Sequence, residues 1–138
     1  MRVLVVDDEL VSRKKMEKIM IAFGDCVAVD SGEAALKAIE TAMEKGDPFN
    51  LITLDVSMPQ MDGTEVLYEI RRIEKQRNIP KENQSKVIMV TAQSDKDTVI
   101  TCVQAGCDGY VVKPFDRAII AGKLKKLGMS APEPVQEG

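Results

Sequence analysis

The sequence predicts an α/β fold in which helices cover both faces of a five-stranded parallel sheet. Short apolar segments alternate with longer amphipathic segments from the first residues to about residue 128, a pattern typical of strands joined by crossover helices. The length of 138 residues suits one domain with one sizeable core. We therefore expect a folded domain over residues 1–128, followed by a flexible tail or linker over residues 129–138.

The expected strands are the short apolar segments. Each holds four residues, mostly Val, Ile and Leu, between polar or turn-forming residues. Nearly continuous apolar runs of this length are typical of strands buried on both faces of a parallel sheet. The segments span residues 3–6, 26–29, 51–54, 87–90 and 109–112.

The first two expected helices show one apolar face each. In the first helix, apolar residues recur at helical spacing up to Phe23, and Gly24 is expected to end it. In the second helix, Asp30 and Glu33 are expected to cap the first turn. The inner-face residues are Met16, Ile19, Met20 and Phe23 in the first helix, and Leu36, Ile39 and Met43 in the second.

The last three expected helices follow the third, fourth and fifth strands. Gly63 is expected to let the preceding loop turn into the third helix, whose polar continuation over residues 76–85 predicts an exposed loop. Ser94 is expected to cap the fourth helix, and Gly128 to end the fifth. The apolar stripes consist of Val66, Leu67, Ile70 and Ile73 in the third helix, and Ile120, Leu124 and Leu127 in the fifth.

Right-handed crossovers restrict how such strands can be ordered. We expect the flavodoxin-like order 2-1-3-4-5, a three-layer sandwich with its site at the carboxyl ends of the strands. The tail contains Pro132 and Pro134 without apolar periodicity, which is typical of a linker. Whether an effector domain follows it is left open.

Composition excludes several classes of function. The net charge is −3, which argues against direct binding of nucleic acid by this domain. The apolar runs are too short to span a membrane, and no signal peptide is evident, so we expect a cytoplasmic protein. Three cysteines and no histidine argue against a disulfide framework, a Cys/His zinc site and a histidine-dependent triad.

Polar side chains stand directly after four of the expected strands. Asp7 and Asp8 follow the first strand, Asp55 the third, Thr91 the fourth and Lys113 the fifth. The carboxyl ends of parallel strands share one edge, so these side chains should meet in one cleft. Two like charges about 4 Å apart repel by about 4 kcal/mol at an effective dielectric near 20, so three carboxylates require a counter-charge. Mg²⁺ or Mn²⁺ fits such a site, and an aspartate can act as a nucleophile toward a phosphoryl group.

These residues belong to a set of motifs that resembles the receiver domain of two-component response regulators, including the chemotaxis type. The resemblance covers residues 2 to about 127, and the motifs occur in order, mostly at strand ends. They comprise Asp7-Asp8, Asp55-Val-Ser-Met-Pro-Gln-Met-Asp-Gly63, Thr91-Ala92, Ala105-Gly106, Tyr110 and Lys113-Pro114.

The resemblance implies roles for the residues of the cleft. Asp55 is similar to the phosphoacceptor, and Lys113 to the lysine that pairs with the phosphoryl group. Asp8 is similar to the direct metal ligand, and Asp7 to the acid that holds a metal-bound water. Ser57 stands where the family lends a backbone carbonyl to the metal. The Lys113–Pro114 bond is expected to be cis.

The resemblance also implies a switch and its partners. Thr91 and Tyr110 are similar to a pair that moves when the phosphoryl group binds, changing the surface of the fourth helix, fifth strand and fifth helix. The phosphoryl donor is expected to be a histidine kinase or phosphotransfer protein. The domain would catalyse only its own phosphorylation and dephosphorylation, so it is not expected to be an enzyme in the ordinary sense.

Three other functions stay open at this point. A haloacid-dehalogenase-like phosphohydrolase would use an aspartyl nucleophile, but that family has a second Asp where this chain has Ser57. A flavin or nucleotide carrier would require a glycine-rich phosphate loop, whereas acids follow the first strand here. A receiver-like domain that no longer accepts phosphate is the third, although every motif residue is present.

Overall fold

A computed structural model describes residues 1–92 and 96–129. Five strands form one parallel sheet in the order β2-β1-β3-β4-β5, which confirms the predicted order and fold class. The strands are β1 (Arg2–Val6), β2 (Asp25–Val29), β3 (Leu51–Asp55), β4 (Lys86–Thr91) and β5 (Gly109–Val112).

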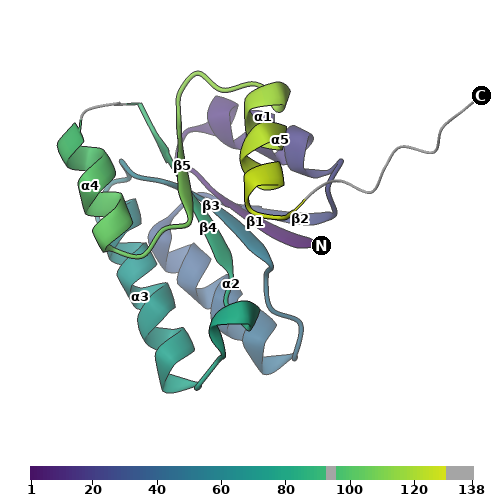
Figure 1. Cartoon of the computed structure of the whole chain (residues 1–138), viewed down its shortest axis with the longest axis vertical. Coiled ribbons are helices and arrows are strands. Elements are labelled where there is room, and N and C mark those ends of the chain that lie inside the picture. The colour runs from purple at the N-terminus through teal and green to yellow at the C-terminus, as the bar shows by residue number, and fades with distance from the viewer. Residues whose placement is uncertain (93–95, 130–138) are drawn as a thin grey trace, which may run out of the picture.

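Helices cover both faces of this sheet, as predicted (Figure 1). Helices α1 and α5 lie on one face, and α2, α3 and α4 lie on the other. Their bounds are α1 (Leu10–Met20), α2 (Gly32–Glu44), α3 (Gly63–Gln76), α4 (Lys96–Gln104) and α5 (Arg117–Lys126), with a short 3₁₀ helix, η1, over Lys81–Asn83. No helix among the described residues is long and apolar enough to cross a bilayer.

Each face of the sheet has its own apolar cluster. In β1, Leu4 and Val6 pack with the cluster of α2, α3 and α4, whereas Val3 and Val5 pack with that of α1 and α5. Alternate residues of a strand point to opposite faces. A strand buried on both faces therefore contains consecutive apolar residues, which explains the nearly continuous apolar runs in the sequence.

The strand register brings the polar residues at the strand ends to one edge. Val6 is level with Leu54, and Asp55 is level with Val90. Thr91 is in turn level with Val112, the last residue of β5. The polar residues at these strand ends therefore converge at the carboxyl edge of the sheet. They are Asp7 after β1, Asp55 at the end of β3, Thr91 at the end of β4 and Lys113 after β5.

The first helix is shorter than its apolar periodicity predicted. It ends at Met20 rather than at Gly24, and Phe23 lies in the turn that follows. The Phe23 N–H donates to the Met20 carbonyl at 2.8 Å, and the ring is still buried in the cluster under α1 and α5. The packing of Phe23 was predicted correctly, because a turn can bury a side chain as well as a helix can.

The cap predicted for the second helix was wrong by one residue. Ser31, not Asp30, is the N-cap, and its hydroxyl accepts a hydrogen bond from the Ala34 N–H at 3.1 Å. An N-cap side chain must directly precede the first helical residue, which is Gly32, to reach the free N–H groups of the first turn. Asp30 stands one residue too early.

The stretch over residues 76–85 is not wholly an exposed loop. It contains η1, and Ser85 at its end is buried, which the polar sequence did not predict. The predicted cap Ser94 and residues 130–138 of the predicted tail lie outside the described residues.

Candidate functional site

Three carboxylates meet at the carboxyl edge of the sheet. Asp7, Asp8 and Asp55 each place a carboxylate oxygen within 4.8 Å of the others. Asp7 and Asp8 follow β1, and Asp55 ends β3, the neighbour of β1 in the sheet. Asp7 and Asp55 are buried, each with 4% exposure, whereas Asp8 is exposed. The site therefore combines two acids taken out of water with a third that faces it.

Lys113 supplies the positive charge of this cluster. Its Nζ lies 3.3 Å from Asp7 Oδ2 and 3.7 Å from Asp55 Oδ2. Lys113 directly follows β5, so its side chain reaches across the end of β4 to these acids. A pocket of about 380 Å³ opens here, with Asp8, Asp55, Ser57 and Lys113 among its lining residues.

The cluster perturbs the protonation of its members. Burial, followed by the neighbouring charge of Asp7, raises the pKa of Asp55 from 3.8 to about 7, although Lys113 acts in the opposite direction. Burial alone would lower the pKa of Lys113, but the carboxylates of Asp55 and Asp7 raise it above its ordinary value. One ammonium therefore does not balance the negative charge of the site, which leaves room for a cation.

Two residues that the sequence analysis missed hold Asp7 in place. The Glu9 N–H donates to Asp7 Oδ1 at 2.9 Å, and Arg13 Nη1 donates to the Asp7 backbone carbonyl at 3.0 Å. Arg13 lies in the first turns of α1, five positions after Asp8. The short distance in sequence between Arg13 and Asp7 was the available signal for this contact. It was easily overlooked, because an arginine near the start of a helix is usually exposed to solvent.

Gly63 is required for a different reason from the one predicted. The φ angle of Gly63 is not positive, so no left-handed backbone conformation requires glycine there. A Cβ at this position would lie 2.2 Å from the Asp55 carbonyl oxygen and 2.9 Å from Val56 Cα. The Gly63 N–H also donates to the Val56 carbonyl at 2.9 Å. The first turn of α3 thus packs directly against the peptide bond that follows Asp55.

The remaining predicted site residues lie around the acidic cluster. Ser57 donates its N–H to Asp55 Oδ1 at 3.4 Å. Thr91 is buried at the end of β4. Tyr110 is half-buried on β5, level with Met89, and the Lys123 ammonium lies 5.1 Å from the centre of its ring. The Lys113–Pro114 peptide bond is cis, as expected.

Comparison with known protein families decides which family this site belongs to. Residues 3–125 match the family of response regulator receiver domains. The chain is a member of that family. The match covers every described strand except for the first residue of β1, together with the acids and the lysine of the cluster.

Several known proteins resemble this receiver domain along most of its length. The chemotaxis protein CheY-3 of Vibrio cholerae is 33% identical over 129 residues, which cover 92% of this chain and 91% of that protein. The structure of a CheX–CheY complex with BeF₃ and Mg²⁺ from Borrelia burgdorferi has a TM-score of 0.78 at 27% identity, covering 93% of this chain and 89% of that one. The receiver domain of the Arabidopsis thaliana histidine kinase CKI1, complexed with Mg²⁺ and BeF₃⁻, has a TM-score of 0.71 at 30% identity, covering 90% and 89%.

The donor set of this receiver domain suits a hard divalent cation. Asp7, Asp8 and Asp55 offer carboxylate oxygens, and Ser57, which lines the same pocket, could add a backbone oxygen. Mg²⁺ and Mn²⁺ prefer such oxygen ligands, and Mg²⁺ commonly takes one or two carboxylates together with phosphate oxygens. The residues therefore fit a resident Mg²⁺ or Mn²⁺ ion.

Proposed function

We propose that this receiver domain is a signalling switch that accepts a phosphoryl group on Asp55 with the help of Mg²⁺ or Mn²⁺. The observation that supports the proposal most strongly is that Asp55 lies among two further acids and within 3.7 Å of the Lys113 ammonium. Two of the structural relatives described above contain Mg²⁺ and BeF₃. Beryllofluoride mimics a phosphoryl group, so an acidic site of this kind can take both ligands together.

In the proposed reaction, a carboxylate oxygen of Asp55 forms a bond to phosphorus while the N–P bond of a donor phosphohistidine breaks. Asp8 and Asp55, the backbone carbonyl of Ser57, and Asp7 through a water molecule would hold the metal ion, which supplies charge stabilisation for the phosphoryl oxygens. The ammonium of Lys113 neutralises another part of that charge. Asp55 must be ionised to attack, and the Lys113 ammonium together with the bound metal ion would favour its ionised form.

The proposed output is a change of surface. The hydroxyl of Thr91 donates to a phosphoryl oxygen, and the ring of Tyr110 follows it inward. The surface of α4, β5 and α5 then changes its preference for a protein partner. That surface already presents apolar side chains, because Ile100, Val103 and Ile119 are 42%, 59% and 44% exposed.

The donor in this proposal is a histidine kinase or a phosphotransfer protein, and the reaction takes place in the cytoplasm. The target is a further protein. Direct contact with nucleic acid is not part of the proposal, because the net charge of −3 offers no excess of cations for a phosphate backbone.

Acetyl phosphate tests the proposed function without a kinase. In the presence of Mg²⁺, we expect one phosphoryl group per chain, located on Asp55 by mass spectrometry. Asp55→Asn should abolish the labelling, and Asp8→Asn should raise the Mg²⁺ concentration needed for it. Asp25→Asn, which replaces an exposed acid at the start of β2, is the matched control and should be labelled normally.

Two results would contradict this proposal. Undiminished labelling of Asp55→Asn would show that another residue is the acceptor. Continuous hydrolysis of an added phosphate ester, at many turnovers per chain, would favour the phosphohydrolase alternative.

A further inference from the structure

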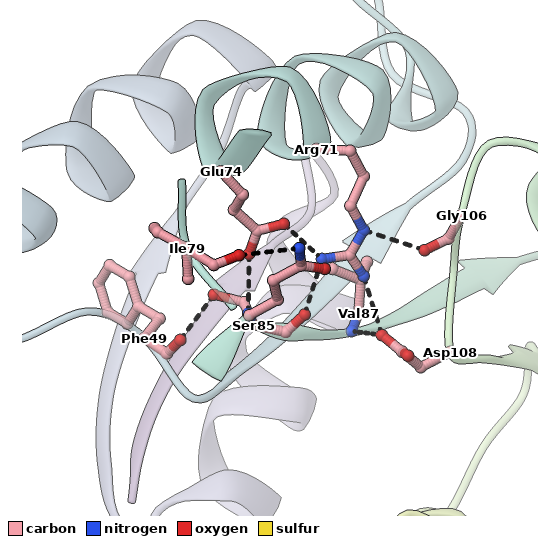
Figure 2. A network of polar contacts seen from close by, with 9 residues as sticks. Phe49, Arg71, Glu74, Ile79, Ser85, Val87, Gly106 and Asp108 are labelled. Atoms are coloured by element: carbon pink, nitrogen blue, oxygen red, sulfur yellow. Dashed lines mark hydrogen bonds and ion pairs between the residues drawn. The ribbon is translucent and has the colours of Figure 1, made fainter. Parts of the chain in front are cut away.

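A polar network joins α3 to residues near the amino ends of β3, β4 and β5 (Figure 2). The acidic cluster lies at the other end of the sheet, where the strands have their carboxyl ends. The centre of the network is Glu74 of α3, whose side chain is fully buried at 0% exposure. Glu74 Oε1 lies 2.7 Å from Arg71 Nη1, and Glu74 Oε2 accepts the Ser85 N–H at 2.8 Å. The Ser85 hydroxyl donates to the Phe49 carbonyl at 2.7 Å. The last turns of α3 are thereby joined to the residues that precede β3 and β4.

The guanidinium of Arg71 extends this network to a third part of the chain. Arg71 Nη1 donates to the Ser85 carbonyl at 2.9 Å, Nε donates to the Gly106 carbonyl at 3.0 Å, and Nη2 lies 2.9 Å from Asp108 Oδ2. The same Asp108 oxygen accepts the Val87 N–H at 2.8 Å. One side chain therefore connects α3, the start of β4 and the turn between α4 and β5, and we call this set of contacts the Arg71 clamp.

Among the described residues, the burial of α4 is concentrated at the end next to the Arg71 clamp. Its buried residue is Cys102, in its last turn, and Ala105 directly after the helix is also buried. Lys96 and Asp97 at the start of the helix are exposed, and the helix begins only a few residues after Thr91, which ends β4 at the edge of the acidic cluster. The two ends of α4 thus differ, because one end leads into Gly106 and Asp108, which Arg71 holds by charge-assisted hydrogen bonds, and the other lies close to the proposed phosphorylation site.

We propose that Arg71 is a positioning residue of the switch. The Arg71 clamp keeps residues 106–108 and the last turn of α4 in place, so that phosphorylation moves the first part of α4 about a fixed end. Glu74 contributes by holding the guanidinium in its orientation. This inference rests on the proposed phosphorylation of Asp55, because that step supplies the displacement at the Thr91 end.

Hydrogen–deuterium exchange on the full chain tests the inference, with Mg²⁺ and beryllofluoride in place of the labile phosphoryl group. In the parent protein, adding beryllofluoride should change exchange in residues 96–100 and leave residues 101–108 unchanged. In Arg71→Lys, the change should extend into residues 101–108, with exchange there faster by about tenfold, because a lysine retains the charge but not the fork of donors. Labelling of Asp55 by acetyl phosphate should be the same in both proteins.

Arg72→Lys is the matched control. Arg72 is the next residue of α3, is largely exposed and pairs with Glu69 on the same helix, so its exchange pattern should equal that of the parent. Asp108→Asn provides a second disruption, since it weakens the contact with Arg71 Nη2 while an amide oxygen can still accept the Val87 N–H. This variant keeps the inference testable if Arg71→Lys unfolds.

The outcomes separate this inference from the proposed function. A uniform change over residues 96–108 in the parent protein, or an unaltered pattern in a folded Arg71→Lys or Asp108→Asn protein, would overturn the role of the Arg71 clamp alone. A parent protein that takes neither beryllofluoride nor a phosphoryl group at Asp55 would overturn the proposed function, and the inference with it.

Discussion

Asp55 is held in an environment that resists its negative charge. The raised pKa means that the folded state keeps a proton which the unfolded chain loses above about pH 4. The contribution of Asp55 to folding stability therefore falls as the pH rises from about 4 to about 7, and is constant above that range. The ionised carboxylate of Asp55 therefore destabilises the folded state most at and above the neutral pH at which the proposed phosphoryl transfer takes place.

Replacing Asp55 by Asn should therefore stabilise the protein when no divalent cation is present. At pH 8 with chelator, we expect Asp55→Asn to raise the free energy of unfolding by about 2 kcal/mol, less than the full shift in pKa would give because Lys113 loses one carboxylate partner. The advantage should grow between pH 4 and pH 7 and then level off. Urea unfolding across this pH range measures it, with the exposed Asp25→Asn as control. A constant difference at all pH values would contradict the perturbation of Asp55.

Gly63 shows how a residue without a side chain can shape the site. Gly63→Ala places a methyl group 2.2 Å from the Asp55 carbonyl oxygen, so the peptide of Asp55 or the start of α3 must move. We expect a loss of about 2 kcal/mol in unfolding free energy and slower labelling of Asp55 by acetyl phosphate.

The matched control is Gly122→Ala. Gly122 lies inside α5, and nothing within 4 Å would contact its added Cβ. The free energy of unfolding of this variant should rise by about 0.5–1 kcal/mol, because alanine favours the helix. Its labelling at Asp55 should not change. Equal effects of the two substitutions would contradict the steric role of Gly63.

At the scale of elements, the buried carboxylate of Glu74 makes α3 dependent on its neighbours. Glu74→Gln would remove the charge that Arg71 faces inside the protein, and we expect a loss of about 2 kcal/mol in unfolding free energy. Glu69→Gln, which removes the partner of the exposed Arg72 on the same helix, should leave the midpoint of urea unfolding unchanged. Similar midpoints for the two variants would contradict the structural importance of the Glu74 network.

The elements themselves were predictable because their patterns are local. The apolar runs marked all the strands, and the stripe Val66, Leu67, Ile70 and Ile73 marked the buried face of α3. The cap at Ser31 and the early end of α1 were missed, since each depends on where one peptide unit leaves the helix. Glu74 and Ser85 were missed for another reason, because their partners come from other elements and no sequence spacing relates them.

At the scale of the whole molecule, the acidic cluster should make stability depend on divalent cations. Mg²⁺ that binds only the folded state raises the free energy of unfolding by about 2.7 kcal/mol at a concentration 100 times its dissociation constant. Thermal unfolding at pH 8 with increasing MgCl₂ should show this rise, and Asp8→Asn should reduce it. NaCl at equal ionic strength is the control, and an equal effect of NaCl would exclude specific binding.

The geometry of this site was predictable because parallel strands end at one edge. Asp7, Asp55 and Lys113 could be placed together from the strand order alone, and the structure brings them within ion-pair distance. The supporting contacts of Arg13 and the close approach of Gly63 could not be foreseen, because they depend on the path of the backbone over a few ångströms.

The sheet order has a consequence for how the chain is made. Of the five strands, β1 leaves the ribosome first, yet it lies between β2 and β3 and needs both as neighbours. Its partner β3 is complete only about fifty residues after β1, which at translation speeds of about 5–20 residues per second leaves the backbone N–H and C=O groups on one edge of β1 unpaired for several seconds. The nascent strand Val3–Val6 is thus open to pairing with other chains before its own sheet can shield it.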